Sequence, residues 1–399
     1  MKQPIVGPLE RTAWALVCAL VFSLPLEKAV MLAGFGTLTR AIGGAALLAG
    51  VAAVAVRRAL RRPNAGLLLA AGFVLWSGVT YLWSIAPAAS AARFTTLAQL
   101  WLMLWLIWEF CRPDERQAWL LRCYVYGAAA SSVLTFLRYA RGQQTYYRRY
   151  ATAGFDPNDL GLTLALAIPM TLYLAARLKR GQRTVVWLCG LTIMAAVLLT
   201  ASRMALAASV AGFAYAALTW RDAPAAQRVF SGVMLAGLLL GALCLAPPAS
   251  RQRLATFHTE LTRGTLHNRT HIWKAGLKAF RRRPLLGVGA GAYPEAVYPW
   301  LGRPPVPGHQ YTAHNTFLSV LAETGAAGAA LFGGLLAVLA AFIAMLRGRE
   351  RALWLTTMAV WAIGVSTLTW EQRKPTWFIM ALVLTAWARA FQPGEDGRI

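Results

Sequence analysis

The decisive stretch of this sequence lies between residues 265 and 325 and contains three polar blocks. They read HNRTHIWKAGLKAF (267–280), PLLGVGAGAY (284–293) and HNTFLSVLAETG (314–325). The segment is basic and rich in His, whereas most of the chain around it is apolar. A polar segment held between apolar spans is where we expect a membrane protein to place its chemistry.

The composition of the chain is that of a membrane protein. Hydrophobic residues make up 58% of the 399 positions and charged residues 14%, and the mean hydropathy is +0.49. A soluble domain carries roughly a quarter charged residues. Many apolar runs reach about 20 residues, the length that crosses a bilayer as a helix. The sequence therefore predicts an all-α, polytopic membrane protein.

The apolar runs predict twelve transmembrane helices in three parts. Residues 1–247 hold helices one to nine, residues 248–314 form a large loop with amphipathic helices of its own, and residues 315–399 hold helices ten to twelve and a short tail. Pro25 interrupts the first span, and the tenth is either one long span or a shorter span behind a half-buried helix. The predicted spans are 12–32, 38–56, 65–83, 94–111, 118–140, 158–176, 184–200, 203–220, 228–247, 315–346, 351–369 and 375–391.

Lys and Arg in the short loops predict the orientation. Four basic loops follow even-numbered spans and mark the cytoplasmic side, so both termini are expected there. The outer side receives four further segments, which are also basic. The cytoplasmic loops are RRALRR (57–62), CRPDER (111–116), RLKRGQR (177–183) and RGRER (347–351), and the outer segments are 141–157, 200–203, 248–314 and 370–375.

The net charge of +25 therefore includes positive charge on the outer side. This excess predicts an anionic ligand there, and attraction to anionic lipid is the alternative. Nucleic acid is not an expected partner, because the chain has no basic soluble domain. The five Cys are scattered in or beside the spans and are interpreted as small buried apolar residues.

Three residues stand out by position. Arg203 closes the turn TASR near the start of a helix, where the macrodipole disfavours a cation, so it is interpreted as one wall of an anion site or as a lipid contact. A helix is predicted over residues 270–281, and extending it back by one turn places Arg269 on its apolar face. A charge there costs free energy unless it is paired or the side chain reaches water. His314 precedes the predicted N-cap Asn315, and neighbouring Arg charges would lower its pKa and keep it a neutral general base.

Other signals are weaker. A helix over residues 270–281 would be amphipathic and would lie on the membrane or cap the bundle, with His271 on its polar face. Its apolar face would hold Trp273, Gly276, Leu277 and Phe280. His267 and His271 have the spacing of a metal pair, but no carboxylate or Cys lies nearby, so no metal is expected. GVGAG (287–291) is interpreted as a turn. Arg148 and Arg149 are expected either to reach the outer cavity or to lie on a solvated face.

Four segments together resemble the O-antigen ligase branch of the O-antigen ligase and polymerase superfamily. They are FDPNDLG (155–161), TASRMALA (200–207), NRTHIWKAGLKAFRRRPLLGVGAGAY (268–293) and HNTFLSVLAETGAAG (314–328). The resemblance implies a membrane glycosyltransferase fold of the C type that acts without metal or other cofactor. It also implies that Arg203 and Arg269 match essential arginines of the family, and His314 its essential histidine.

The resemblance further implies the reaction and its location. The donor would be O-antigen linked to undecaprenyl diphosphate, and the acceptor a sugar hydroxyl of lipid A–core. Arg203 and Arg269 would hold the leaving diphosphate, with Arg148 and Arg149 as further substrate contacts. His314 would take the acceptor proton as that oxygen attacks C1, with inversion. We expect a monomer in the bacterial inner membrane, in contact with lipids, with its active site facing the periplasm.

Three alternatives stay open. An O-antigen polymerase would use the same donor with a glycan acceptor. A protein O-oligosaccharyltransferase shares the HN-containing loop but usually carries a soluble C-terminal extension, which is not expected here because the last predicted span lies within a few residues of position 399. A transporter of lipid-linked anionic substrate would show ionisable groups near the membrane midplane, whereas the predicted spans are nearly free of charge.

Overall fold

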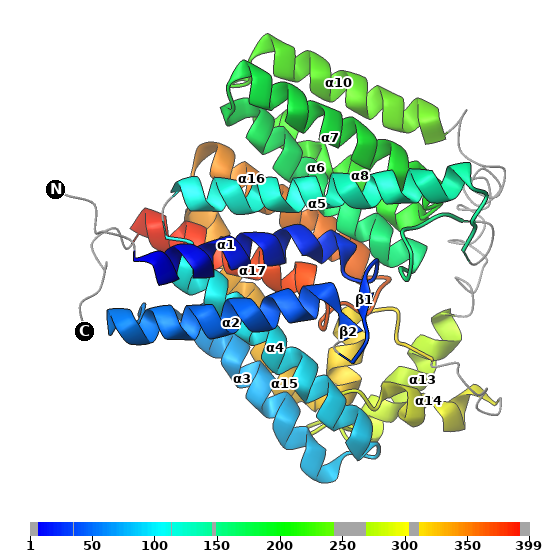
Figure 1. The fold of residues 1–399 in the computed structure, drawn as a ribbon. Helices are drawn as coiled ribbons and strands as arrows, with labels where there is room; N and C mark the ends of the chain where they lie inside the picture. Colours follow the sequence, from blue (N-terminus) through cyan, green and yellow to red (C-terminus); the bar gives the residue numbers. More distant parts are fainter. Residues whose placement is uncertain are drawn as a thin grey trace.

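A computed structural model describes residues 7–34, 36–112, 114–145, 149–242, 269–302 and 311–391. Within these residues the chain is almost entirely helical, and its only sheet is the antiparallel pair of β1 (Met31–Leu32) and β2 (Gly36–Thr37). Long helices lie side by side in a bundle (Figure 1). The first part of the chain holds α1 (Pro8–Ser23), η1 (Leu24–Leu26), α2 (Leu38–Arg57), α3 (Ala65–Val79), η2 (Thr80–Trp83), α4 (Pro87–Phe110), α5 (Asp114–Ala140) and α6 (Pro157–Arg177).

The second part of the chain contributes the remaining helices. α15 bends at Gly325, whose φ of 68° and ψ of −172° are not helical, so the predicted tenth span does consist of two pieces. The helices are α7 (Arg180–Leu199), α8 (Arg203–Gly212), α9 (Ala214–Leu218), α10 (Ala225–Leu240), α13 (Arg269–Arg282), α14 (Tyr293–Leu301), α15 (Thr316–Met345), α16 (Gly348–Val365) and α17 (Lys374–Phe391).

Eight helical segments of the described residues are long and apolar enough to cross a membrane. They are α1 with η1, α2, α3 with η2, α4, α5, α6, α7 and α15. The predicted span 203–220 is divided into α8 and α9, and α10 is also short. The structure thus confirms an all-α chain with several membrane spans, and the count of twelve stays a prediction.

Helix α6 lies at the centre of the bundle because its sequence is apolar on every side. The Asp156 side chain caps it by accepting a hydrogen bond from the backbone N–H of Asn158, and Pro157 occupies the first turn, where no N–H donor is needed. Nearly all of its residues are buried, and it packs against α5, α7, α8 and α16. A helix that is hydrophobic all round has to be enclosed by others.

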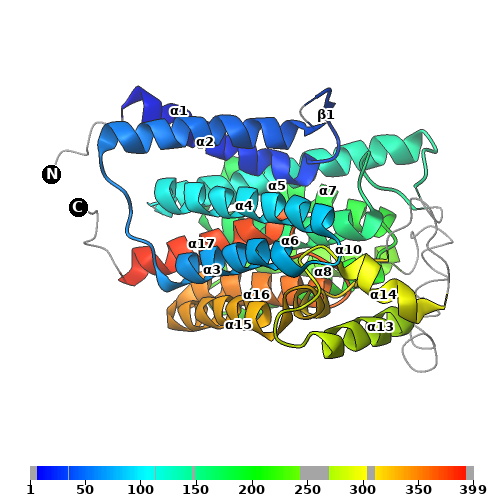
Figure 2. The same ribbon diagram turned by 90° about the horizontal axis from the view of Figure 1, so that it is seen from below.

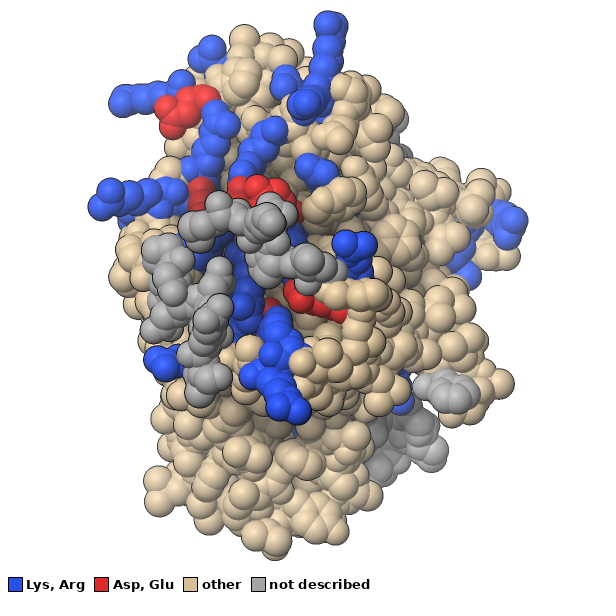
Figure 3. All heavy atoms as spheres, turned by 60° about the vertical axis from the view of Figure 1, so that its left-hand side comes forward, with Lys and Arg blue, Asp and Glu red and all other residues tan. Residues whose placement is uncertain are grey.

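The bundle has two ends, which the two ribbon views separate in the same way (Figures 1 and 2). We call them the terminus end, where α1 begins and α17 ends, and the loop end, where α13, α14 and the β1–β2 pair lie. Lys and Arg gather around a few carboxylates at the terminus end (Figure 3). Ion pairs there include Arg112 with Glu109, Arg177 with Asp114, and Arg389 with Glu350.

Close packing between α1 and α5 generates a prediction for stability. A Cβ atom added to Gly127 would lie 2.0 Å from the backbone oxygen of Phe22, whereas one added to Gly44 in α2 would meet nothing within 4 Å. Gly127→Ala should therefore destabilise the fold by about 1–3 kcal/mol, because backbone has to move. The loss of stability is measured as a lower melting temperature of the purified protein in detergent, with size-exclusion chromatography as the readout of unfolding. Gly44→Ala is the control, and equal melting temperatures for the two variants would contradict the packing.

Candidate active site

Segments from distant parts of the sequence meet at the loop end. Arg203 is the first residue of α8, Arg269 is the first residue of α13, and His314 precedes the N-cap of α15. The start of α6 and the segment 366–373 between α16 and α17 lie beside them, as the contacts below show. The predicted candidates Arg203, Arg269 and His314 are all half-buried.

The TASR turn is shaped by local hydrogen bonds. Ser202 caps α8 by accepting a hydrogen bond from the N–H of Ala205 at 3.3 Å, which makes Arg203 the first residue of that helix. Ala201 has a φ of 50°, a conformation that non-glycine residues rarely adopt. A Cβ at Gly161 would lie 2.6 Å from the Cβ of Ala205. The FDPNDLG segment is therefore seated directly against the turn that presents Arg203.

Arg149 joins the same two segments from inside. Its side chain is 4% exposed, its Nε donates to the carbonyl oxygen of Thr200 at 2.6 Å, and one of its terminal nitrogens donates to Asn158 Oδ1 at 2.8 Å. These bonds hold the TASR turn against the start of α6. The predicted contact of Arg149 with substrate stays a prediction, and Arg148 lies outside the described residues.

Arg203 and Arg269 act on each other through their charges. Burial lowers the pKa of Arg269 below its ordinary value, the positive charge of Arg203 lowers it further, and Asp156 acts in the opposite direction. Two guanidinium groups from different helices are thus close enough for their charges to interact, and the carboxylate of Asp156 acts on Arg269 as well. Guanidinium groups in this arrangement favour an anion that accepts hydrogen bonds from both, such as a phosphate.

His314 is held in a strained backbone conformation next to α13. Its φ is 45°, and its Nε2 lies 3.3 Å from Thr312 Oγ1. The indole N–H of Trp273 in α13 donates to the carbonyl oxygen of Ala313 at 2.8 Å, so the helix that begins at Arg269 also fixes the residue before His314. Strain of this kind persists where the surrounding structure enforces it, and it is frequent at functional sites.

The start of α15 is also tied to α6, through the segment 366–373. Thr316 donates to Leu368 O and accepts from the N–H of Trp370, at 2.9 and 2.8 Å. Asp159 of α6 accepts hydrogen bonds from the side chains of Trp370 and Arg373, at 2.9 and 2.8 Å. Sequence reasoning missed Asp159 and Arg373 as residues that form the site. The signal for them was a charged residue in each of the polar segments FDPNDLG (155–161) and WEQRKP (370–375).

Lys28, from the N-terminal part of the chain, lies near the charged residues Asp159 and Arg373. It follows η1, next to Glu27, which pairs with Lys374. Burial lowers the pKa of Lys28, the charge of Arg373 lowers it further, and nearby carboxylates, including Asp159, raise it. The loop end therefore holds more positive groups than the four predicted arginines.

The predicted apolar face of α13 is only partly enclosed by the protein. Trp273 and Gly276 lie toward the protein, but Leu277 is 39% exposed, and the buried side chains are Ile272, Ala275 and Ala279. The helix packs against α14 and α15, so its buried face is the one that meets these two neighbours.

A buried ion cluster that the sequence did not reveal supports the loop between α13 and α14. Arg93 of α4 pairs with Glu323 of α15 at 2.9 Å and with Glu371 at 2.7 Å. Glu323 also accepts a hydrogen bond from the N–H of Gly291 at 2.8 Å. The predicted turn at GVGAG is confirmed: Gly287, Gly289 and Gly291 all have positive φ.

Metal ligation has few candidates. Among the residues that the structure describes, no group of three or more His, Cys, Asp and Glu side chains is arranged to hold a metal ion. His267 lies outside those residues, so its predicted spacing with His271 has no counterpart to compare.

The fold and the site together define a multi-pass helical membrane protein with a cationic site at one end of its bundle. Residues 184–333 match the model of a protein family described as O-Antigen ligase. This match confirms the resemblance predicted from the sequence, and it includes Arg203, Arg269 and His314. No curated protein matches the chain.

The ion cluster generates a second prediction. Glu323→Gln removes the charge that binds Arg93 and leaves a side chain whose single carbonyl oxygen has to serve both Arg93 and Gly291. We expect a loss of stability of about 2 kcal/mol and faster hydrogen exchange in residues 285–292. Hydrogen-exchange mass spectrometry measures both. Glu10→Gln at the terminus end, where Glu10 lies 3.6 Å from Arg116, is the matched control. Unchanged exchange in the loop would show that the cluster does not hold it.

Proposed function

We propose that the protein is a glycosyltransferase that moves O-antigen polysaccharide from undecaprenyl diphosphate to a sugar hydroxyl of lipid A–core. The observation that carries the proposal is the pair Arg203 and Arg269, two half-buried arginines that begin different helices at the loop end and whose charges interact. The family match over residues 184–333 supports activity of the O-antigen ligase and polymerase type. Both arginines and His314 fall within the matched residues.

The proposed mechanism follows from the charge that develops during transfer. As the bond between sugar C1 and the diphosphate oxygen breaks, negative charge grows on the leaving diphosphate. Arg203 and Arg269 would stabilise that charge by hydrogen bonds that strengthen in the transition state. A ring nitrogen of His314 would accept the proton of the acceptor hydroxyl while its oxygen forms the new bond to C1. The products are the extended acceptor and free undecaprenyl diphosphate.

The proposed location follows from the same assignment. The terminus end would face the cytoplasm and the loop end the periplasm, in the bacterial inner membrane, with twelve spans and a fold of the C type. Three of the four basic loops predicted to be cytoplasmic contribute to ion pairs at the terminus end, through Arg112, Arg177 and Glu350, which supports this orientation. We propose that the protein acts as a monomer.

The decisive test of the proposed function is transfer by purified protein. In EDTA, wild-type protein should transfer glycan from undecaprenyl diphosphate to lipid A–core. His314→Asn should lose at least about a hundredfold in rate, because general bases contribute roughly that much or more. Asn tolerates positive φ well, so this variant keeps the backbone conformation of His314 while removing the base. Folding of the variant is checked by its melting temperature.

The outcome of this assay also separates the alternatives. Transfer onto glycan but not onto lipid A–core would indicate a polymerase, and transfer onto protein would indicate a protein O-oligosaccharyltransferase. Movement of the lipid-linked substrate across proteoliposomes without any transfer would indicate a transporter. Full activity of a folded His314→Asn variant would remove His314 from the mechanism.

The arginine pair generates a separate prediction. Arg203→Gln and Arg269→Gln should each lower kcat by about a hundredfold or more, because each removes charge from the leaving group in a half-buried site. The double variant should lose less than the product of the two single losses, because both act on one diphosphate. Arg141→Gln, an exposed arginine after α5, is the charge-matched control and should retain activity. Fully multiplicative losses would contradict a shared ligand.

The stereochemistry of the product tests the single-displacement mechanism. Attack on C1 from the side opposite the diphosphate inverts the anomeric configuration. Proton NMR of the new glycosidic bond, compared with that of the donor, should therefore show inversion. Retention after one transfer would require a covalent intermediate or a second displacement and would rule out the proposed role of His314 as a simple base.

A further inference from the structure

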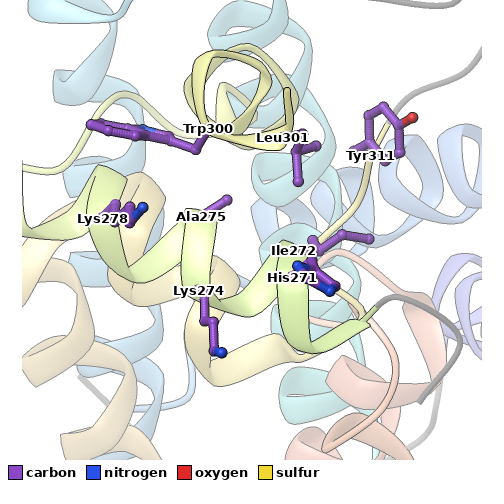
Figure 4. A pocket seen from close by; sticks show the side chains of 8 residues that line it. All are labelled: His271, Ile272, Lys274, Ala275, Lys278, Trp300, Leu301 and Tyr311. Carbon is purple, nitrogen blue, oxygen red and sulfur yellow. The ribbon is translucent and has the colours of Figure 1, made fainter. Parts of the chain in front are cut away.

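A separate cavity lies between α13 and α14 (Figure 4). Its volume is about 330 Å³. Figure 4 shows Trp300 of α14 on one wall and Lys278 of α13 facing it, with Tyr311 and His271 at the other end. Its lining residues are His271, Ile272, Lys274, Ala275, Lys278, Trp300, Leu301 and Tyr311.

The walls of this cavity combine aromatic rings with positive charge. The Lys278 Nζ lies 5.2 Å from the centre of the Trp300 ring, and the Arg282 guanidinium lies 4.5 Å from it. No carboxylate of the described residues forms an ion pair with Lys278. Aromatic faces pack against the C–H groups of sugar rings, and an ammonium group on a flexible stem binds phosphate or carboxylate as a point charge.

The position of the cavity relates it to the candidate active site. One end, at His271, is two residues from Arg269 on the same helix, and Tyr311 is three residues before His314. The other end, at Lys278, lies nine residues beyond Arg269, about 14 Å along the helix axis. A sugar at Lys278 is therefore not the sugar that reacts, but one further along the same saccharide.

We infer that this cavity is a saccharide subsite that binds a sugar ring carrying a phosphate or carboxylate group. Trp300 and Tyr311 would contact the ring and Lys278 its acidic group. The inference rests on the proposed function in taking the ligand to be part of a substrate glycan. Such a sugar belongs either to the acceptor core or to the donor repeat unit, and the chemistry of the cavity is the same for both.

Binding without reaction tests the subsite independently of transfer. Isothermal titration of the protein in lipopolysaccharide-free nanodiscs would use two non-lipidated probes: phosphorylated core oligosaccharide and an acidic O-antigen repeat unit. Lys278→Gln should weaken binding of one probe by at least about fivefold, the loss of one charged contact. The same core oligosaccharide after removal of its phosphates should bind wild type and Lys278→Gln equally weakly. Arg141→Gln should bind like wild type, which separates a local contact from a general loss of charge.

The probe that responds identifies the source of the ligand. A response of the core oligosaccharide assigns the cavity to the acceptor, and a response of the repeat unit assigns it to the donor. Trp300→Leu, checked for folding, should weaken binding of the same probe, and if that probe is the core oligosaccharide it should do so even after the phosphates are removed. Equal binding of both acidic probes by wild type and Lys278→Gln would overturn the subsite. It would leave the proposed function intact, since that is judged by transfer with wild-type protein.

Discussion

Repulsion between Arg203 and Arg269 is the constraint on which the loop end depends. Each arginine occupies the first turn of its helix, where the helix dipole adds further positive character. Burial and the charge of Arg203 both disfavour the charged form of Arg269, and the carboxylate of Asp156 acts in the opposite direction. An arrangement of this kind is stabilised by an anion that bonds to both groups. A leaving group whose negative charge increases during the reaction is stabilised most at the moment of bond breaking.

The rest of the loop end keeps these charges from moving apart. Arg149 fixes the turn before Arg203 against the start of α6, and Asp159 fixes α6 against the segment that holds the start of α15. Trp273 then connects α13 to the residue before His314. Because each connection uses buried or half-buried groups, the site is pre-organised by the fold before substrate arrives. These connections run between segments that are up to 214 residues apart in the sequence.

Much of this organisation was predictable from the sequence. Apolar run lengths and Pro25 predicted the long helices and the interruption of the first span, because a membrane imposes a length on its helices. The division of the tenth span was one of two alternatives that they left open. Polar or charged residues at unusual positions pointed to Arg203, Arg269 and His314. What the sequence did not predict depends on tertiary pairing: the cluster of Arg93, Glu323 and Glu371, and the bridge at Asp159.

The features that the sequence left open have the same physical origin. Helical periodicity placed Leu277 on an apolar face but does not identify the neighbour that covers that face, and Leu277 is 39% exposed. For Arg149 a solvated face was one of two alternatives, and its hydrogen bonds to Thr200 and Asn158 enclose it instead. Glu323 lies inside a predicted span, and its pairing with Arg93 joins two helices, which a single-helix pattern does not show.

The most direct measurement is a cryo-EM map of the protein in nanodiscs with undecaprenyl diphosphate bound. The account predicts density for the diphosphate between the guanidinium groups of Arg203 and Arg269 at the loop end, with the lipid chain running along the bundle. Ordered diphosphate at the terminus end, or at the loop end but in contact with neither arginine, would contradict it.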